Sequence, residues 1–565
     1  MALLFAQTTT AQPKTDLGRD FWFCIPQNYD RVLDNTRYFY LYITATSNTT
    51  INVQIGGAPV ITRSATAFQT IALRSPTDIS KSNEMLTSGV VEKNKSIHVW
   101  SEDADLSVSF FSQVPSHTSE GMYCIPTIGW GTQYVVASYN SLINDSDEPS
   151  EFTIVANQDN TTVTITPSSD IRKDASVAVI GHPKGTSFSV TLNKGECIQY
   201  QTAGRPYDGT DLSGSLIVAD RPIGVEGASA CPEIPTRDNT CNYILEMLLP
   251  IRAWGKQYFT AQFTDRKYGG DGFMVVGSKQ GQIVNRNGLQ AAVLTNIFDF
   301  VYLYDITNTS YWTSDAPFML VQYILCASHA NPGPPSLSNR NNGNPAMLII
   351  NPAEQYTNQL VFNIPSRTES FSADYLTVVS PRAHHDSLLL DGRRIGSWNN
   401  VNKTRSFIID SIWEAIEVTF SNLAEGSHIL ISDSLIGAFI YGYALHGSYA
   451  MSCGLGTKTI NGLEAAVHEH LPLNFGFTAE AITPNPLIGK RTLIASYSLQ
   501  SQAPLRLELF DQLGNSVAVL LSSDLHPEGI FEKQINIPSD LATGIYYYRY
   551  TCGSTHISGK LVIVK

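Results

Sequence analysis

Pro126-Thr-Ile-Gly-Trp130-Gly-Thr-Gln-Tyr134 is the stretch that decides the fold, because it returns later in the chain. Its second copy is Pro250-Ile-Arg-Ala-Trp254-Gly-Lys-Gln-Tyr258, and a third form is Pro352-Ala-Glu-Gln-Tyr356. An aromatic residue follows each proline by four positions, and a strand-like run comes directly after each copy. Cys24-Ile25-Pro26, which recurs as Cys124-Ile125-Pro126, supplies an earlier marker. Repetition at this spacing indicates supersecondary units in series, so we expect four β-modules.

Other segments also recur at about the spacing of one module. Residues 222–231 and 317–326 share one proline-to-cysteine spacing, and residues 434–443 look like a further version. Residues 48–53 and 160–165 are each a turn that enters an alternating β-branched strand. The predicted fold class is therefore all-β. Tandem β-sandwich-like modules are the first choice, and propeller-like closure is the alternative.

The repeats also suggest module boundaries. We expect a signal-peptide remnant at 1–12, modules at 13–125, 126–249, 250–351 and 352–476, a linker at 477–483, and a separate small domain at 484–565.

Composition restricts the function classes. Charged residues make up 15% of the chain, against roughly 25% in typical soluble domains. The net charge of -13 argues against a nucleic-acid partner, which needs clustered Lys and Arg. No stretch approaches the roughly 18 apolar residues of a membrane-spanning helix. The start, Met1-Ala-Leu-Leu-Phe-Ala6, resembles the end of a signal-peptide core.

The C-terminal residues predict an Ig-like β-sandwich of their own. Pro484-Asn485-Pro486 interrupts regular structure, and alternating strands flank a turn that contains Gly514. A Tyr-rich strand then follows, and the chain ends on a short apolar run. Its marker residues are Gly544, Tyr546, Lys560 and Lys565.

This order of elements resembles the C-terminal sorting domain of type IX secretion substrates. The resemblance implies that the export machinery is a partner and that the protein is secreted or carried on the outer cell surface. It also implies that the domain is usually removed after export.

A second resemblance covers the repeats. Residues 16–29, residues 211–225 and residues 248–258, with Cys231 and Cys241, are similar to the IgG Fc-binding-protein N-terminal domain family. The similarity is clearest over residues 16–263 and fades toward residue 476. It implies an extracellular binding or adhesion module, whose ligand does not follow from the family label.

Export into an oxidising compartment favours disulfides. Cys231 and Cys241 flank a turn-rich loop and are the expected pair. Cys24 and Cys124 share the Cys-Ile-Pro context, which leaves their pairing open.

The sequence provides candidates for a metal site. Asp145, Asp147 and Glu148 form an acidic turn that suits calcium, although a hydrated loop explains them as well. No other cofactor is expected. The pair of histidines in His468-Glu469-His470 lacks a third ligand.

Signals of catalysis are weak. His384, His385 and Asp386 fit an exposed loop. The repeated residues Trp130 and Trp254 are assigned to module cores. We therefore expect a protein that is not an enzyme.

The interpretation that follows is a secreted or cell-surface binding or adhesion protein. Its ligand would be an extracellular glycoprotein, polysaccharide or matrix component, held by the loops at 231–241 and 327–345. The alternative is a structural surface component that self-associates into a filament or layer. An extracellular hydrolase is the third hypothesis.

Overall fold

The computed structural model is nearly all β and divides near residue 463 into a larger N-terminal and a smaller C-terminal unit. It describes residues 17–564 apart from 30–36, 115–116, 141–147, 175, 204–209, 237–239, 265–268, 331–342, 366–370, 372–373, 399–401, 409–411, 421–424, 445–446, 462–476, 490, 500–502, 512–514, 540 and 553–554.

The first module of the larger unit is a sandwich of two four-stranded sheets, in the orders β1-β7-β3-β4 and β5-β2-β8-β9. Alternation of apolar and polar residues produces these strands, as Ile51, Val53 and Ile55 of β3 show by facing the core. The strands are β1 (Asp20–Phe23), β2 (Tyr38–Ala45), β3 (Thr49–Ile55), β4 (Ile61–Ala65), β5 (Thr70–Arg74), β7 (Ile97–Trp100), β8 (Leu106–Val114) and β9 (Thr118–Tyr123), while β6 (Val91–Glu92) joins the next module.

Each later module is built around one long strand. In the second module this is β17 (Leu216–Ser229), in the third β24 (Ser310–Ile324) and in the fourth β32 (Gly426–Tyr443). The first half of the long strand pairs with the strand that opens the module, which is β10, β19 or β26. The second half pairs with the strand that closes it, which is β18, β25 or β33.

The remaining strands extend these sheets, except that β13 (Ile171–Lys173) and β14 (Ser176–His182) form a separate two-stranded sheet. In the second module they are β10 (Gly131–Val135), β11 (Ser150–Ala156), β12 (Thr161–Thr166), β13 (Ile171–Lys173), β14 (Ser176–His182), β15 (Phe188–Leu192), β16 (Cys197–Gln201) and β18 (Ile244–Met247). In the third they are β19 (Gly255–Thr260), β20 (Asp271–Gly277), β21 (Gln282–Arg286), β22 (Leu289–Leu294), β23 (Phe300–Ile306) and β25 (Ala346–Ile349), with the short helix α1 (Ala327–Ala330). In the fourth they are β26 (Thr357–Ile364), β27 (Asp374–Pro381), β28 (Leu389–Leu390), β29 (Arg393–Arg394), β30 (Asn402–Ile408), β31 (Trp413–Phe420) and β33 (Ser448–Ser452).

The repeated Trp-Gly-x-Gln-Tyr sequence lies where the long strand changes partners. The Tyr134 hydroxyl donates to Ile223 O at 2.8 Å and accepts from Gly131 N at 2.8 Å, across a register shift between β10 and β17. In the third module the Tyr258 hydroxyl makes the same two hydrogen bonds: it accepts from Gly255 N and donates to Phe318 O. Trp130 and Trp254 are buried, as expected for core residues, and each indole N–H donates to a carbonyl just upstream. The motif therefore stabilises the bulge at which the long strand passes from one pairing partner to the next.

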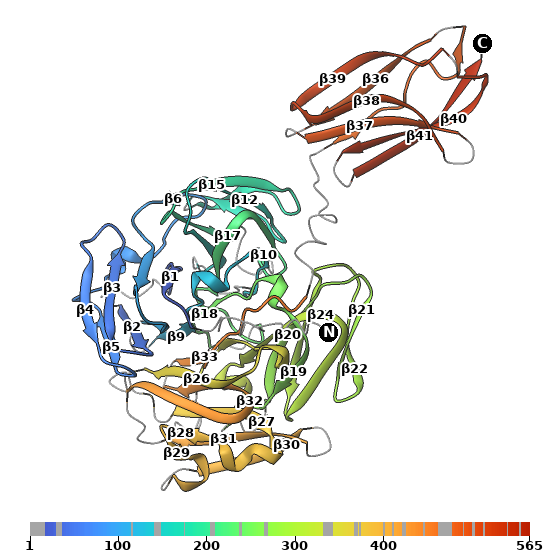
Figure 1. Ribbon diagram of the computed structural model, residues 1–565. Helices are drawn as coiled ribbons and strands as arrows, with labels where there is room; N and C mark the ends of the chain where they lie inside the picture. The colour runs from blue at the N-terminus through green and yellow to red at the C-terminus, as the bar shows by residue number, and fades with distance from the viewer. Residues whose placement is uncertain are drawn as a thin grey trace, which may run out of the picture. The chain divides into compact units, whose positions relative to one another are not determined.

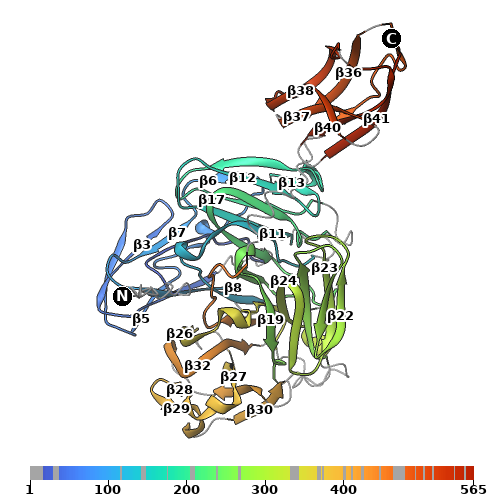
Figure 2. The same cartoon turned by 45° about the vertical axis from the view of Figure 1, so that its right-hand side comes forward.

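The four modules close into a ring around their last strands (Figure 1). Strands β9, β18, β25 and β33 touch one another in cyclic order, and the last touches the first again. Figure 2 shows the sheets of the second and third modules from another side. The all-β prediction is confirmed, and the structure combines the two-layered modules with the ring closure that the sequence left open. The expected module boundaries stay a prediction.

Buried carboxyl groups fasten this ring. Glu120 on β9 accepts hydrogen bonds from Met347 N on β25 and Ala450 N on β33, each at 2.9 Å. Glu246 on β18 accepts from Ile349 N at 3.2 Å. Burial raises the pKa of both carboxyl groups well above the usual range. These side chains satisfy strand N–H groups that would otherwise be buried without an acceptor.

The C-terminal unit is a separate β-sandwich with its own core. One sheet runs β34-β36-β39 and the other β35-β41-β40-β37-β38. Leu493, Leu507, Tyr550 and Leu561 are among the residues buried between them. The strands are β34 (Thr478–Ala479), β35 (Leu487–Ile488), β36 (Thr492–Leu499), β37 (Ala503–Phe510), β38 (Ser516–His526), β39 (Gly529–Asn536), β40 (Gly544–Cys552) and β41 (Thr555–Val564). Among the described residues of the whole chain, no helix has the length and apolar character to cross a bilayer.

Candidate binding face and family

The strands β9, β18, β25 and β33 line the inside of the ring, and we call them the inner strands. The four connections that lead into them meet at one end of the ring. Asn242 joins them: its side-chain oxygen accepts from Ser119 N at 2.8 Å, and its amide donates to Ser119 O at 2.8 Å and Pro345 O at 2.6 Å. The Ser119 hydroxyl in turn donates to Ser448 O at 3.0 Å. One residue from each module therefore lies at this junction, which we call the loop face. No sequence signal marked Asn242, because its partners are far away in the chain.

Two of the four connections are long, and they are the loops that the sequence analysis selected. Cys326 N donates to Ile234 O at 2.6 Å, and the Cys326 thiol donates to Thr240 O at 2.7 Å. The hydroxyls of Thr240 and Ser328 lie 3.3 Å apart. Residues 237–239 and 331–342 lie outside the described residues. The structure therefore brings the bases of both loops together on the loop face.

The Cys231–Cys241 disulfide is present, with 5.1 Å between the two Cα atoms. It closes the shorter loop as predicted. The Glu148 carboxylate lies within 4.8 Å of both sulfur atoms and is buried. Because both sulfurs are bonded to each other, they provide no thiolate for a metal. Asp145 and Asp147 lie outside the described residues, so calcium binding stays a prediction.

A buried tyrosine cluster supports the loop face. The hydroxyls of Tyr139 and Tyr304 lie 2.6 Å apart, Tyr302 donates to Asp211 at 2.7 Å, and Tyr323 donates to Ser138 O at 2.8 Å. Burial raises the pKa of Asp211 and of the tyrosines. The hydroxyls therefore keep their protons and act as fixed donors beneath the loops.

Cys24 and Cys124 are not bonded to each other in the structure, and their pairing, which the sequence left open, stays a prediction. Both residues are buried free thiols. Cys24 follows β1, at the edge of one sheet of the first module, and Cys124 follows β9, at the edge of the other sheet.

The candidate histidines do not converge on a catalytic or metal site. His384 Nδ1 lies 2.7 Å from Asp433, while His385 Nδ1 lies 2.9 Å from Glu414. Each imidazole therefore has its own carboxylate partner. The second histidine pair, at 468–470, lies outside the described residues.

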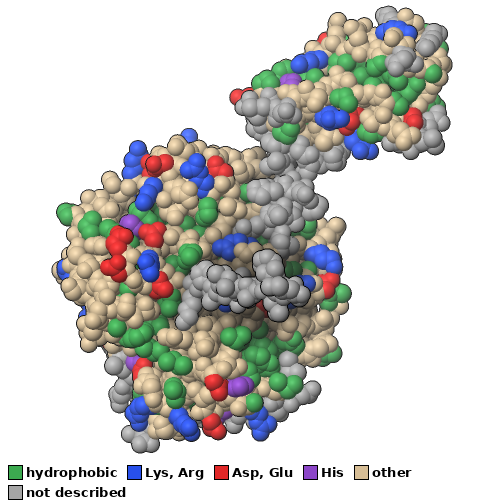
Figure 3. Space-filling view, viewed as in Figure 1, with side chains coloured by type: hydrophobic (Ala, Val, Ile, Leu, Met, Phe, Trp, Pro, Cys, Tyr) green, Lys and Arg blue, Asp and Glu red, His purple; other side chains and the backbone are tan. Residues whose placement is uncertain are grey.

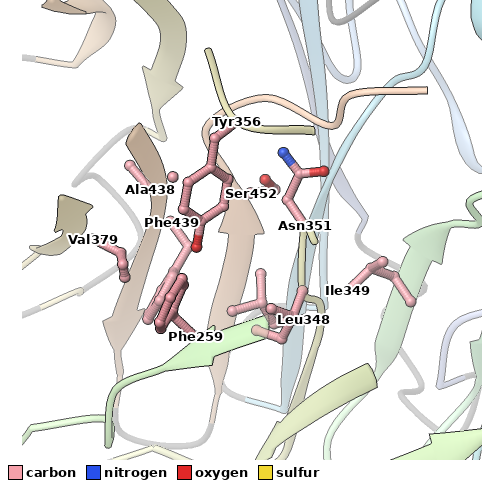
Figure 4. Close-up of a pocket in the computed structure, with 11 residues that line it drawn as sticks. Phe259, Leu348, Ile349, Asn351, Tyr356, Val379, Ala438, Phe439 and Ser452 are labelled. Atoms are coloured by element: carbon pink, nitrogen blue, oxygen red, sulfur yellow. The ribbon is translucent and has the colours of Figure 1, made fainter. Parts of the chain in front are cut away.

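A pocket between the third and fourth modules is too small for a sugar or peptide (Figure 4). Phe259, Tyr356 and Phe439 line it with aromatic surface, and Asn351 and Ser452 add polar atoms. Its volume of about 20 Å³ is about that needed for a water molecule.

Several of the marker residues predicted for the C-terminal domain make contacts within its larger sheet or along the edge of that sheet. Asn485 Oδ1 accepts from Val562 N at 3.0 Å, and its amide donates to Lys560 O, so the segment between Pro484 and Pro486 follows β41. The Tyr546 hydroxyl donates to Ala542 O at 3.0 Å, and Gly544 pairs with Ile563. Gly514 and Lys565 lie outside the described residues.

Comparison with known proteins identifies both units. A sequence model described as secretion system C-terminal sorting domain matches residues 481–564. The protein is therefore a type IX secretion substrate, secreted or held on the outer cell surface. A human IgGFc-binding protein is 27% identical over 220 residues, which is 38% of this chain and 4% of the human protein. The chain thus spans a small fraction of that relative.

Similarity to solved structures is slight. A tetra-tandem repeat from the extending region of a large adhesion protein is 11% identical, with a TM-score of 0.11 over 80% of this chain and 94% of the other. A Salmonella alpha-2-macroglobulin is 8% identical, with a TM-score of 0.15 over 98% of this chain and 40% of the other. These scores carry no argument about the fold.

The part of the ring from its strand β9 onward matches a known sequence family. The sequence model described as IgGFc binding protein matches residues 120–442, which run from the β9 strand of the ring to the end of β32. This match covers more than half of the chain, and the chain therefore belongs to the IgGFc-binding protein family.

Proposed function

We propose that the protein is an extracellular, non-enzymatic binding protein that recognises a protein or glycan ligand with its loop face. The observation that carries the proposal is the convergence of the two longer connections of the loop face, with Asn242 and the Cys231–Cys241 disulfide fixing their bases. Loops on a rigid scaffold are common binding surfaces, because the scaffold has already met the cost of ordering them. Membership of the family supports a binding role.

Acidic and basic side chains are interspersed on the face of the larger unit seen in Figure 3. Both protein and glycan probes are therefore included in the test. The immunoglobulin Fc region is included among the probes because the human relative carries it in its name.

Arrays of glycans, extracellular glycoproteins and IgG Fc test this proposal with the exported protein. We expect a specific ligand whose binding is lost when residues 331–342 are replaced by a Gly-Ser stretch of equal length. Lys184→Ala, in an exposed hairpin elsewhere on the second module, is the matched control and should bind normally. Binding that survives the loop replacement would place the site elsewhere, and turnover of a bound polymer would contradict the non-enzymatic role.

Self-association into a surface layer is the second candidate function. The outer hairpin β21–β22 exposes Ile283, Leu289 and Val293 by 44, 76 and 48%. An edge strand with exposed apolar residues is suited to pairing with another copy. Sedimentation of the purified protein over a concentration series tests this role, with Leu289→Ser as the variant expected to reduce assembly.

A further inference from the structure

We propose that the first module carries a second binding site, for a neutral polysaccharide chain, on the outer face of the sheet β1-β7-β3-β4. We call this surface the aromatic face. Its residues are Asp20, Trp22, Asn52, Thr62, His98 and Trp100. None of them belongs to the loop face, and the proposal does not depend on the function proposed for that face.

The register of the sheet brings these side chains to one surface. Alternate residues of its strands are buried inside the sandwich, as Ile51 and Val99 show. Because successive side chains of a strand point to opposite faces, the residues between the buried ones lie on the outer face. Strands β3 and β4 lie at the outside of the ring (Figure 1). One row of paired residues crosses the four strands in the order Asp20, Trp100, Asn52 and Thr62.

The aromatic residues of this face form a fixed stack. The His98 ring lies between those of Trp22 and Trp100, with centroid distances of 3.8 and 4.2 Å and interplanar angles of 11° and 16°. His98 Nε2 lies 2.6 Å from Asp20 Oδ1. Trp22 is buried, and Lys194 Nζ of the second module lies 5.9 Å from the centroid of its ring. The stack is therefore closed at Trp22 and ends at Trp100.

Trp100 supplies the apolar half of a sugar site. The residue is partly exposed, and among the residues that the structure describes only the His98 ring stacks on it. A pyranose has a face of C–H groups that packs on an indole ring, and its hydroxyls need hydrogen-bonding partners around that contact. Because the stack holds the indole in place before a ligand arrives, binding costs little side-chain entropy.

Asn52 and Thr62 supply the polar half beside Trp100. The Thr62 hydroxyl donates to Asn52 Oδ1 at 3.0 Å, which orients the amide. Within the described part of the chain the Asn52 amide nitrogen makes no hydrogen bond, so it can donate to a ligand hydroxyl. Since neighbouring strands lie about 4.8 Å apart, the row from Trp100 to Thr62 spans about 10 Å. This length suits an extended chain better than a single sugar.

The charges of the row favour a neutral chain. Asp20 is its only charged residue, and this carboxylate already has two partners, His98 and the Thr127 hydroxyl, which donates at 2.9 Å. The row contains no lysine or arginine to bind an acidic polymer. A neutral polysaccharide needs only the indole, amide and hydroxyl groups that the row presents.

Affinity gel electrophoresis of the exported protein tests the proposal. The probes are a soluble β-glucan, a mannan and a xylan, with polygalacturonate as the acidic comparison. We expect at least one neutral polymer to retard the protein. Trp100→Ala should weaken this binding about tenfold, and Asn52→Ala about fivefold. Gln69→Ala, which removes an exposed amide between β4 and β5, is the matched control and should bind like the wild type.

The loop-face variant separates the two sites. Replacing residues 331–342 by the Gly-Ser stretch should leave polysaccharide binding unchanged, and loss of binding in that variant would place the site on the loop face. Retardation by none of the neutral polymers, retardation by polygalacturonate alone, or wild-type binding by both Trp100→Ala and Asn52→Ala would each overturn the proposal. If Trp100→Ala fails to fold, the comparison of Asn52→Ala with Gln69→Ala decides the question.

Discussion

Single buried carboxyl groups connect modules that lie far apart in the sequence. Glu120 contacts backbone groups 227 and 330 residues away, and Glu226 joins Cys24 N to the second module from a distance of 202 residues. Each acid lies in an interior where burial disfavours its charge. These residues therefore stabilise the ring through hydrogen bonds and make its stability depend on pH.

Replacing Glu120 tests the hydrogen bonds at the ring centre. Glu120→Ala leaves the N–H groups of Met347 and Ala450 buried without their acceptor, and we expect a loss of about 2–4 kcal/mol of unfolding free energy. Glu120→Gln keeps one acceptor oxygen and should lose less. Urea denaturation measures both variants. Glu102→Ala, at an exposed position, is the control, and a loss there equal to that of Glu120→Ala would contradict the assignment.

Because of Glu226, we expect the free energy of unfolding to fall as the pH rises. Burial raises its pKa from 4.5 to about 7, so the folded state binds the proton more tightly than the unfolded state. Protonated Glu226 makes its full contribution to the free energy of unfolding below about pH 4.5. This contribution, about 3 kcal/mol, is lost as the pH rises through about 7. Glu226→Gln should remove this decline. Urea midpoints at pH 5 and pH 8 measure it, and parallel profiles of the two proteins would refute the prediction.

At the scale of the element, the long strand of each module does most to set the architecture. β17, β24 and β32 each pair with the opening strand in their first half and with the inner strand in their second half. The sequence marked only the second half of each long strand, as the repeated segments 222–231, 317–326 and 434–443, because such a repeat is a local feature. It did not predict the change of partner, because a bulge depends on which backbone lies opposite.

The tyrosine bridge at the bulge is open to a direct test. Tyr134→Phe removes the bond to Ile223 O and the acceptor for Gly131 N, so we expect a loss of about 1–3 kcal/mol. Tyr258→Phe should cost a similar amount, since its hydroxyl has the same two kinds of partner. Chemical denaturation of both variants provides the measurement. Tyr311→Phe, whose hydroxyl makes an exposed hydrogen bond to Gln257, should change little.

At the scale of the whole molecule, the chain is a ring followed by an independent sandwich. The C-terminal unit buries its own cluster of apolar residues, which meets the requirement for autonomous folding. We therefore expect residues 477–565, expressed alone, to unfold in one cooperative transition. Differential scanning calorimetry should find the same midpoint in the full chain, and a non-cooperative melt of the isolated unit would contradict its independence.

Export should depend on this second unit. Deleting residues 484–565 removes the sorting domain while leaving the ring intact, so we expect the truncated protein to stay inside the cell. Immunoblots of cell and medium fractions measure the distribution. Unchanged export of the truncated protein would contradict the assignment of the tail.

The sequence by itself determined the strands, the repeat of modules, the sorting domain and the Cys231–Cys241 bond. These features are encoded in short stretches such as Trp130-Gly-Thr-Gln-Tyr134 or in residues close along the chain. Only the tertiary structure decided that the modules close into a ring, that Asn242 joins four connections, and that Glu120 bonds to strands of two other modules. Those contacts link residues separated by a hundred positions or more, and no local pattern records which backbone a buried side chain will meet.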